Sequence, residues 1–317
     1  MKIKEIFHKI LCSTLSIFFR SKTVKHILKL NSKEKMLFLR KIIDENIKYH
    51  KSENNELIIK KPSLKFVEHY NQLPCTVETR KKRADLLEKN GYRDKEILLM
   101  GDDDLLCVEL ASRKFKYITV LDCDKSLLNK LKILTHDAKF PITFLHIDLY
   151  QGLPNYLSKL FSVICFDPPQ NYYDLKIFLD CALKAVKHKN SSIYMMMNAN
   201  AMGEIFTIRI LNYLDVFGFK NTQKFEYFNC YPLNRGQSWL LNLMSYFTHN
   251  YHERKKGFKC LYYFTDCLEF KSMTQINDKV NKLEESQSNN QPSSHLSYPE
   301  YPVAFFIPFN KHHNKKI

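Results

Sequence analysis

From residue 95 onward, short apolar runs alternate with stretches that have one apolar face, and this alternation predicts an α/β fold. The short runs read as buried parallel strands, at Glu96–Met100, Tyr117–Leu121, Thr143–Ile147, Phe161–Phe166 and Ser192–Met197. The stretches between them predict helices, at Leu105–Lys114, Asp124–Leu134, Leu175–Val186 and Met202–Val216. Two later β-like runs, Gln223–Phe228 and Leu261–Phe270, add a pair of strands at one edge. We therefore predict a doubly wound, mostly parallel sheet.

The same patterning divides the chain into three parts. Residues 1–70 hold three short helical patterns and a strand at Glu56–Lys60, which predicts a small winged-helix-like domain. Residues 71–275 hold the α/β pattern, and the late pair of strands favours the Rossmann-like sheet of S-adenosylmethionine-dependent methyltransferases. A charged helix at Val77–Lys89, capped by Thr76, precedes the first strand. Residues 276–317 are polar and predict a mobile C-terminal tail.

Charge and cysteine content indicate which partners and which cellular compartment suit the protein. The formal net charge of the 317 residues is +16, and about half of it lies in the first fifty, where it would suit nucleic acid or another anionic partner. The nine cysteines include no CxxC pair, which indicates buried thiols in a reducing compartment and no zinc site or disulfide framework. No apolar run approaches the ~20 residues of a membrane span. We expect a cytoplasmic protein without a bound metal.

Acidic residues stand at the end of four predicted strands, in a chain that is otherwise basic. Gly101 closes the first strand and is followed by Asp102, Asp103 and Asp104; the later strand ends supply Asp122, Asp148 and Asp167. The carboxyl ends of parallel strands form one ligand-binding edge, so these side chains are expected to converge. Adjacent carboxylates repel one another and favour a cationic ligand. The single glycine of this turn, with aspartates beside it, disfavours a dinucleotide or ATP.

Individual carboxylates have roles that their positions suggest. Asp122 follows the glycine turn by about twenty residues, the usual position of an acid that binds ribose hydroxyls. Asp148 either accepts from an adenine amino group or caps the next turn, and Asp124 favours a helix cap. Pro168 restricts Asp167 to an extended backbone, which holds its carboxylate at the strand end, where it could orient an amine.

Several motifs in one order resemble the branched-chain polyamine synthases, the N4-bis(aminopropyl)spermidine synthase family. These motifs are Asn71–Thr76, the helix with Arg80 and Arg83, the GDDDL turn at 101–105, Leu121–Asp124 and the DPP at 167–169. The resemblance implies a winged-helix-like domain before a Rossmann-like catalytic domain, and aminopropyl transfer from decarboxylated S-adenosylmethionine to spermidine. It also implies that Gly101 and the three aspartates after it form the family's GDDD site. The chain departs from the family pattern at Asn71, at Leu106 and after the DPP, which leaves the amine acceptor open.

On this basis we expect an aminopropyltransferase. Gly101, Asp102, Asp122 and Asp148 would bind the donor, and Asp103, Asp104 and Asp167 would hold the amine, with Asp167 orienting it and relaying its proton. We favour a polyamine over nucleic acid as the partner, expect no membrane contact, and leave a homodimer open. The alternative is a class I methyltransferase acting on an amine of nucleic acid or protein, since DPPQ is close to the DPPY tetrad. A third hypothesis is a regulator with a degenerate enzyme domain.

Overall fold

The computed structural model describes residues 40–48, 74–169, 172–187, 189–199, 204–233, 238–239, 241–243, 245 and 262–273. The predicted winged-helix-like domain of residues 1–70 lies outside this set except for residues 40–48, which are helical. The predicted tail of residues 276–317 and the strand expected at Glu56–Lys60 also lie outside it.

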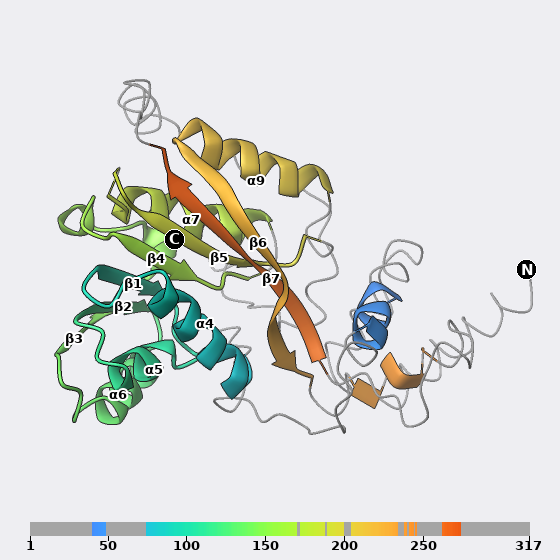
Figure 1. The fold of residues 1–317 in the computed structure, drawn as a ribbon, viewed down its shortest axis with the longest axis horizontal. Coiled ribbons are helices and arrows are strands. Elements are labelled where there is room, and N and C mark those ends of the chain that lie inside the picture. Colours follow the sequence, from blue (N-terminus) through green and yellow to red (C-terminus); the bar gives the residue numbers. More distant parts are fainter. Residues whose placement is uncertain are drawn as a thin grey trace, which may run out of the picture.

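One seven-stranded sheet forms the centre of the molecule, in the order β3-β2-β1-β4-β5-β7-β6 (Figure 1). Its strands are β1 Glu96–Met100, β2 Tyr117–Asp122, β3 Ile142–His146, β4 Val163–Phe166, β5 Ser192–Met197, β6 Phe219–Pro232 and β7 Tyr262–Ser272. Strands β1 to β5 pair in parallel, and β7 runs antiparallel to both β5 and β6. The doubly wound parallel sheet with a late pair of strands at one edge is confirmed.

Helices cover both faces of the sheet (Figure 1). They are α4 Val77–Lys89, α5 Leu106–Ser112, α6 Lys125–Leu134, α7 Tyr172–Ala185 and α9 Glu204–Val216, with 3-10 turns η2 Leu149–Gln151 and η3 Asn155–Leu157. Alternate residues of β1 point to opposite faces, as the period of a strand requires. Leu98 and Met100 pack in one apolar cluster with α7 and α9, whereas Ile97 and Leu99 pack in the other with α4, α5 and α6. The sheet therefore lies between two apolar cores, one on each face.

Most element boundaries agree with the pattern of the sequence. Strands β1 and β5 begin and end at the predicted residues, and Thr76 caps α4 by accepting from the Thr79 amide at 3.2 Å. Helix α5 is shorter than predicted at both ends, because Leu105 before it has φ +61° and Lys114 after it has φ +63°, left-handed conformations that a helix does not contain.

The β6 strand is longer than the predicted run because two irregularities interrupt its alternation. Its register with β7 shifts between Asn221 and Gln223 and again between Phe225 and Asn229. At the second shift Tyr227 has φ +51°, and its amide donates to Asp266 at 2.9 Å. A bulge of this kind increases the bend of a strand and redirects the side chains beyond it. The last residues of β6 thereby reach α4, where the Thr76 amide donates to the Cys230 carbonyl at 2.9 Å.

The helical residues 40–48 meet the sheet at the start of β7. The side-chain amide of Asn46 donates to the carbonyl of Tyr262 at 2.9 Å and its oxygen accepts from the Tyr262 amide at 3.3 Å. Among the residues that the structure describes, none belongs to a helix with the length and hydropathy needed to cross a lipid bilayer.

Candidate active site

The turn after β1 is the centre of the candidate site. Gly101 has φ +74°, a conformation that strains other residues, and its amide donates to the Leu121 carbonyl on β2 at 2.8 Å. A Cβ at Gly101 would meet open space, so the backbone conformation and not crowding requires glycine. Leu105 also has a positive φ, and between these two residues the chain turns sharply into α5. The three aspartates of the turn consequently face different neighbours.

Asp102 faces the start of α5. Its two carboxylate oxygens accept from the amides of Leu106 at 2.7 Å and Cys107 at 3.0 Å, which satisfies two N–H groups that the helix itself leaves free. Burial raises the pKa of Asp102 to about 7, although these hydrogen bonds act in the opposite direction. Leu106, one of the departures from the family pattern, is buried in the core beside this cap. The role of Asp102 toward the donor stays a prediction.

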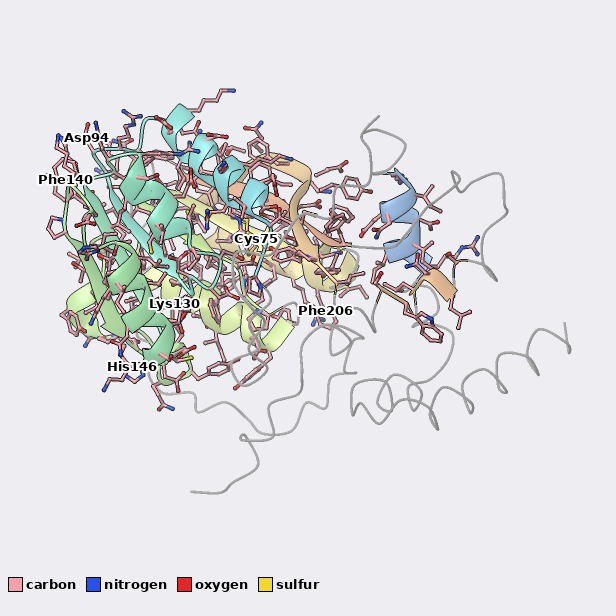
Figure 2. The ribbon with its side chains drawn as sticks, turned by 90° about the horizontal axis from the view of Figure 1, so that it is seen from below. Cys75, Asp94, Lys130, Phe140, His146 and Phe206 are labelled. Carbon is pink, nitrogen blue, oxygen red and sulfur yellow. The ribbon has the colours of Figure 1, made fainter. Side chains whose placement is uncertain are left out.

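Asp104 faces α4. It accepts from Nη1 of Arg83 at 2.5 Å and also from the backbone amide of Cys75. Cys75, labelled in Figure 2, lies just before α4. Both side chains of the Arg83–Asp104 pair are almost fully buried. A buried pair of this kind is costly to break, because the partner left behind keeps an uncompensated charge. The turn after β1 is thus tied to the helix that precedes β1.

Arg83 uses all its nitrogen atoms at the carboxyl edge of the sheet. Besides Asp104 it donates from Nη2 to Asp167 at 2.7 Å and to the Tyr231 hydroxyl at 2.9 Å, and from Nε to Asn229 at 2.8 Å. The amide of Asn229 donates in turn to the Thr265 hydroxyl at 2.9 Å. Burial works against the charge of Arg83, but Asp104, Tyr231, Cys75 and Asp167 together outweigh it, and the pKa of the guanidinium lies well above its usual value.

Asp167 follows β4 and shares this arginine. Its Oδ2 accepts from Arg83 and from the Tyr231 hydroxyl, whereas its Oδ1 has no hydrogen bond to any residue that the structure describes. Burial raises the pKa of Asp167 to about 6, against the influence of Arg83. Burial and the nearby Asp167 also raise the pKa of Tyr231, which therefore stays a neutral hydroxyl.

Asp103 differs from its two neighbours. Its side chain is half-buried, and in the described part of the chain no cation or hydrogen-bond donor contacts its carboxylate. The charges that act on it are those of Asp104, Asp167, Asp122 and Asp102. Burial and this repulsion hold the pKa of Asp103 well above its usual value. Among the described residues, no positive charge therefore neutralises the Asp103 carboxylate.

Asp122 and Asp148 lie at the ends of β2 and β3. Asp122 accepts from the Asp124 amide at 2.7 Å and more weakly from the Asp102 amide at 3.4 Å, and burial raises its pKa to about 6. Asp124 caps α6 through the amides of Ser126 at 2.8 Å and Leu127, which confirms the predicted cap. Asp148 caps η2 through the Tyr150 amide at 3.0 Å. Of its two readings the structure shows the cap, and contact with a donor stays a prediction.

The structure therefore places Asp102, Asp103, Asp104, Asp122 and Asp167 in one electrostatic cluster. Sequence reasoning missed how Arg83, Asn229 and Tyr231 enter it. A signal for Arg83 exists, because Thr79, Arg83 and Leu87 are spaced by four and lie on the buried face of α4. The described residues contain no group of three or more His, Cys, Asp or Glu arranged to hold a metal ion.

The strand order of the sheet identifies the class of fold to which this chain belongs. The strand order with one reversed strand, β7, is that of the α/β proteins with a methyltransferase-like fold. A branched-chain polyamine synthase from Thermus thermophilus, solved in complex with N4-aminopropylspermidine and 5'-methylthioadenosine, has a similar fold. The TM-score is 0.57 at 18% identity, over 74% of this chain and 64% of that one, so the likeness concerns the fold alone.

The sequence then gives the family. The model of the branched-chain polyamine synthase A C-terminal domain matches residues 52–288, and the chain belongs to this family. It is 31% identical over 128 residues to the N(4)-bis(aminopropyl)spermidine synthase of Methanocaldococcus jannaschii, which is 39% of this chain and 37% of that protein. It is 30% identical over 121 residues to the synthase of the same name from Thermococcus kodakarensis, 37% of this chain and 34% of that protein. The matched part spans about a third of the length of these curated relatives.

Proposed function

We propose that the chain is an aminopropyltransferase, which moves the aminopropyl group of decarboxylated S-adenosylmethionine to an amine of a polyamine such as spermidine. The observation that carries this proposal is Asp103, a carboxylate among other carboxylates with no cation against it in the described residues. An ammonium or amine is the ligand that relieves such repulsion. Two relatives carry the name of this activity, and the Thermus thermophilus structure holds an aminopropylated spermidine with methylthioadenosine.

For the donor we propose the β1 and β2 ends of the sheet. Gly101 lets the chain turn so that the adenosine can lie over the start of α5, beside Asp102 and Asp148. The Asp122 carboxylate accepts from the backbone amides of Asp124 and Asp102, and its two oxygens have room for further hydrogen bonds from ribose hydroxyls. A sulfonium donor without a carboxylate suits this acidic edge, because a carboxylate on the donor would face Asp102 and Asp103.

For the acceptor we propose Asp103 as the carboxylate that contacts the amine, with Asp104 and Asp167 behind it. The amine lone pair forms a bond to the carbon beside the sulfonium, the carbon–sulfur bond breaks, and its electrons stay on sulfur as methylthioadenosine leaves. The proton of the amine is lost to Asp167, whose Oδ1 is open and whose pKa of about 6 suits a base near neutral pH. Positioning two cationic substrates provides most of the rate in this scheme.

A donor and acceptor assay with mass-spectrometric detection tests the proposal. Decarboxylated S-adenosylmethionine with spermidine is expected to give methylthioadenosine and spermidine carrying one or more aminopropyl groups. Methylation of an amine with S-adenosylmethionine, and no product from the decarboxylated donor, would replace the proposal with the methyltransferase alternative. The cytoplasmic setting is also proposed, on the seven free cysteines among the described residues, which suit a reducing compartment.

A further inference from the structure

We infer that Arg83 is a positioning residue that keeps the acceptor amine neutral: its fixed charge, held between Asp104 and Asp167, offsets the carboxylates that would otherwise hold the amine as an ammonium ion. This inference rests on the proposed function, because it concerns the amine that the cluster would bind. Arg83 acts through the two carboxylates and is not itself assigned a contact with substrate.

The chemistry sets two opposing demands on this cluster. Negative charge attracts a polyamine, which is cationic near neutral pH because alkylammonium groups have pKa values of about 10. Attack on the carbon beside a sulfonium needs a lone pair, which the ammonium form lacks. Carboxylates close to an amine favour its charged form and so work against the reaction. A cation fixed in the same cluster removes part of this effect while the site stays acidic.

The geometry makes Arg83 a fixed charge. Its guanidinium donates to Asp104 at 2.5 Å, to Asp167 at 2.7 Å, to the Tyr231 hydroxyl and to Asn229, so it has no freedom to leave. An arginine in this setting does not lose its proton at working pH. The two carboxylates that it contacts are among the four whose charges act on Asp103, and they are the two that act most strongly. An amine beside Asp103 would therefore feel Arg83 together with Asp104 and Asp167.

Other titratable groups face this cluster from the surrounding elements. They are Cys75 before α4, Cys165 on β4, Tyr231 on β6, Tyr263 and Cys267 on β7, and, through Tyr263, Glu45 of the helical residues 40–48. Burial raises the pKa of each thiol and phenol, so these groups stay uncharged across the neutral range. The charge that faces the amine is set by Asp102, Asp103, Asp104, Asp122, Asp167, Glu45 and Arg83.

The test compares variants that change this charge with variants that do not. Arg83→Gln removes the charge, Arg83→Lys keeps it with fewer hydrogen bonds, and Tyr231→Phe removes a neighbouring hydrogen bond without changing charge. Because Arg83→Gln leaves two buried carboxylates unpaired, the double variant Arg83→Gln/Asp104→Asn restores the charge balance and limits the loss of stability. Circular dichroism and thermal unfolding select the variants that are folded.

Two measurements are made on each folded variant. The first is the pH profile of kcat with decarboxylated S-adenosylmethionine and spermidine, which reports ionisation in the bound complex. The second is spermidine affinity between about pH 7 and about pH 10, which needs no turnover. In the wild type, kcat is expected to rise on the acid side as the bound amine and Asp167 lose their protons. Affinity is expected to strengthen with pH, because the reacting amine binds neutral while the other amines of spermidine stay charged, and this slope separates the amine from Asp167.

In Arg83→Gln the carboxylates are no longer offset and favour the ammonium form of the bound amine. The acid-side midpoint of the kcat–pH profile is therefore expected to move up by about one pH unit or more, and spermidine affinity is expected to depend less on pH. Arg83→Lys, Tyr231→Phe and the double variant are expected to keep the wild-type midpoint even where kcat falls. An unmoved midpoint and an unchanged affinity slope in Arg83→Gln would overturn the inference. If the wild type binds spermidine but transfers nothing, the proposed function fails while the affinity slopes still decide the role of Arg83; if spermidine does not bind, both fail.

Discussion

The acidic edge has two halves whose carboxylates are stabilised in different ways. On the β2 side, Asp102, Asp122 and Asp124 accept from backbone amides within a few residues or across one strand pair. On the β4 side, Asp104 and Asp167 are held by Arg83, whose helix precedes the sheet, and Asp167 also by Tyr231 from its far edge. The first half is built from local backbone geometry and the second from tertiary side-chain contacts.

Asp103 stands between these halves and belongs to neither. It has no cation and no backbone amide against its carboxylate in the residues described, and the charges of both halves act on it. A folded protein keeps such a group where a ligand completes it, since a carboxylate held among carboxylates costs stability. On this comparison we propose that Asp103 contacts the amine, whereas the carboxylates of the two halves also hold the structure around it.

The largest expected effect is the loss of activity in Asp103→Asn. The amide keeps the shape of the side chain but removes the charge that would hold the amine, so aminopropyl product is expected to fall by at least ~100-fold with the fold intact. Asp167→Asn is expected to lose product as well, because it removes the open oxygen proposed to take the proton. Product is measured by mass spectrometry, with Asp137→Asn, at an exposed carboxylate, as the matched control. Unchanged turnover in both variants would contradict the assignment of this cluster.

Replacing Arg83 is expected to have the largest effect on stability. Arg83→Met leaves Asp104 and Asp167 buried without their cation, and the free energy of unfolding is expected to fall by about 3–5 kcal/mol. Arg93→Met is the matched control, because Arg93 pairs with Glu88 at the exposed surface and is expected to change the same quantity by less than ~1 kcal/mol. Urea unfolding measures both. Equal effects in the two variants would mean that the β4 half is not held by its buried ion pairs.

Stability is also expected to depend on pH in a way that the cluster sets. The pKa values of Asp102, Asp122 and Asp167 are raised to about 7, 6 and 6, so the folded state binds more protons than the unfolded state between about pH 4 and about pH 7. The free energy of unfolding should therefore fall as pH rises through this window. Glu96, whose pKa is lowered to about 2 by Ser162 and by Lys187, titrates below the window.

Urea unfolding at several pH values measures this slope, and Asp122→Asn should reduce it. Stability that rises steadily from about pH 4 to about pH 7 would show that the clustered carboxylates are not held in the folded state as described.

The smallest effect is expected at a cap of the β2 half. Asp124→Ala removes the acceptor of two amides at the start of α6 and should lower the free energy of unfolding by about 1 kcal/mol. Asp124→Asn should be close to neutral, because asparagine caps a helix as well as aspartate does. A loss in Asp124→Asn equal to that in Asp124→Ala would mean that the charge of Asp124, and not its hydrogen bonds, stabilises the start of α6.

The β2 half could be predicted from the sequence because its determinants are local. A strand-ending glycine followed by acids places Gly101 to Asp104 at the ligand edge, and Asp124 before a helical pattern indicates a cap. The doubly wound, mostly parallel sheet with a late pair of strands at one edge follows from the alternation of short apolar runs and amphipathic stretches, and the structure confirms it.

The β4 half could not be predicted in the same way. Arg83 contacts Asn229 and Tyr231 across 146 and 148 residues, and these contacts exist because the bulged β6 strand brings its end to α4. Neither the bulge nor the turn at Tyr227 leaves a periodic signal in the sequence. The aspartates could be located from their strands, and the spacing of α4 marks Arg83 as buried, whereas the partners of Arg83 could be found only from the fold.

Thermal unfolding with spermidine in the presence of methylthioadenosine tests the role of Asp103 most directly. At about pH 8, above the raised pKa values of Asp102, Asp122 and Asp167, spermidine is expected to raise the melting temperature of the wild type, because a ligand of the folded state stabilises it. Asp103→Asn is expected to lose that rise while keeping a similar melting temperature without ligand. A rise in Asp103→Asn equal to that of the wild type would contradict the assignment of Asp103 to the amine.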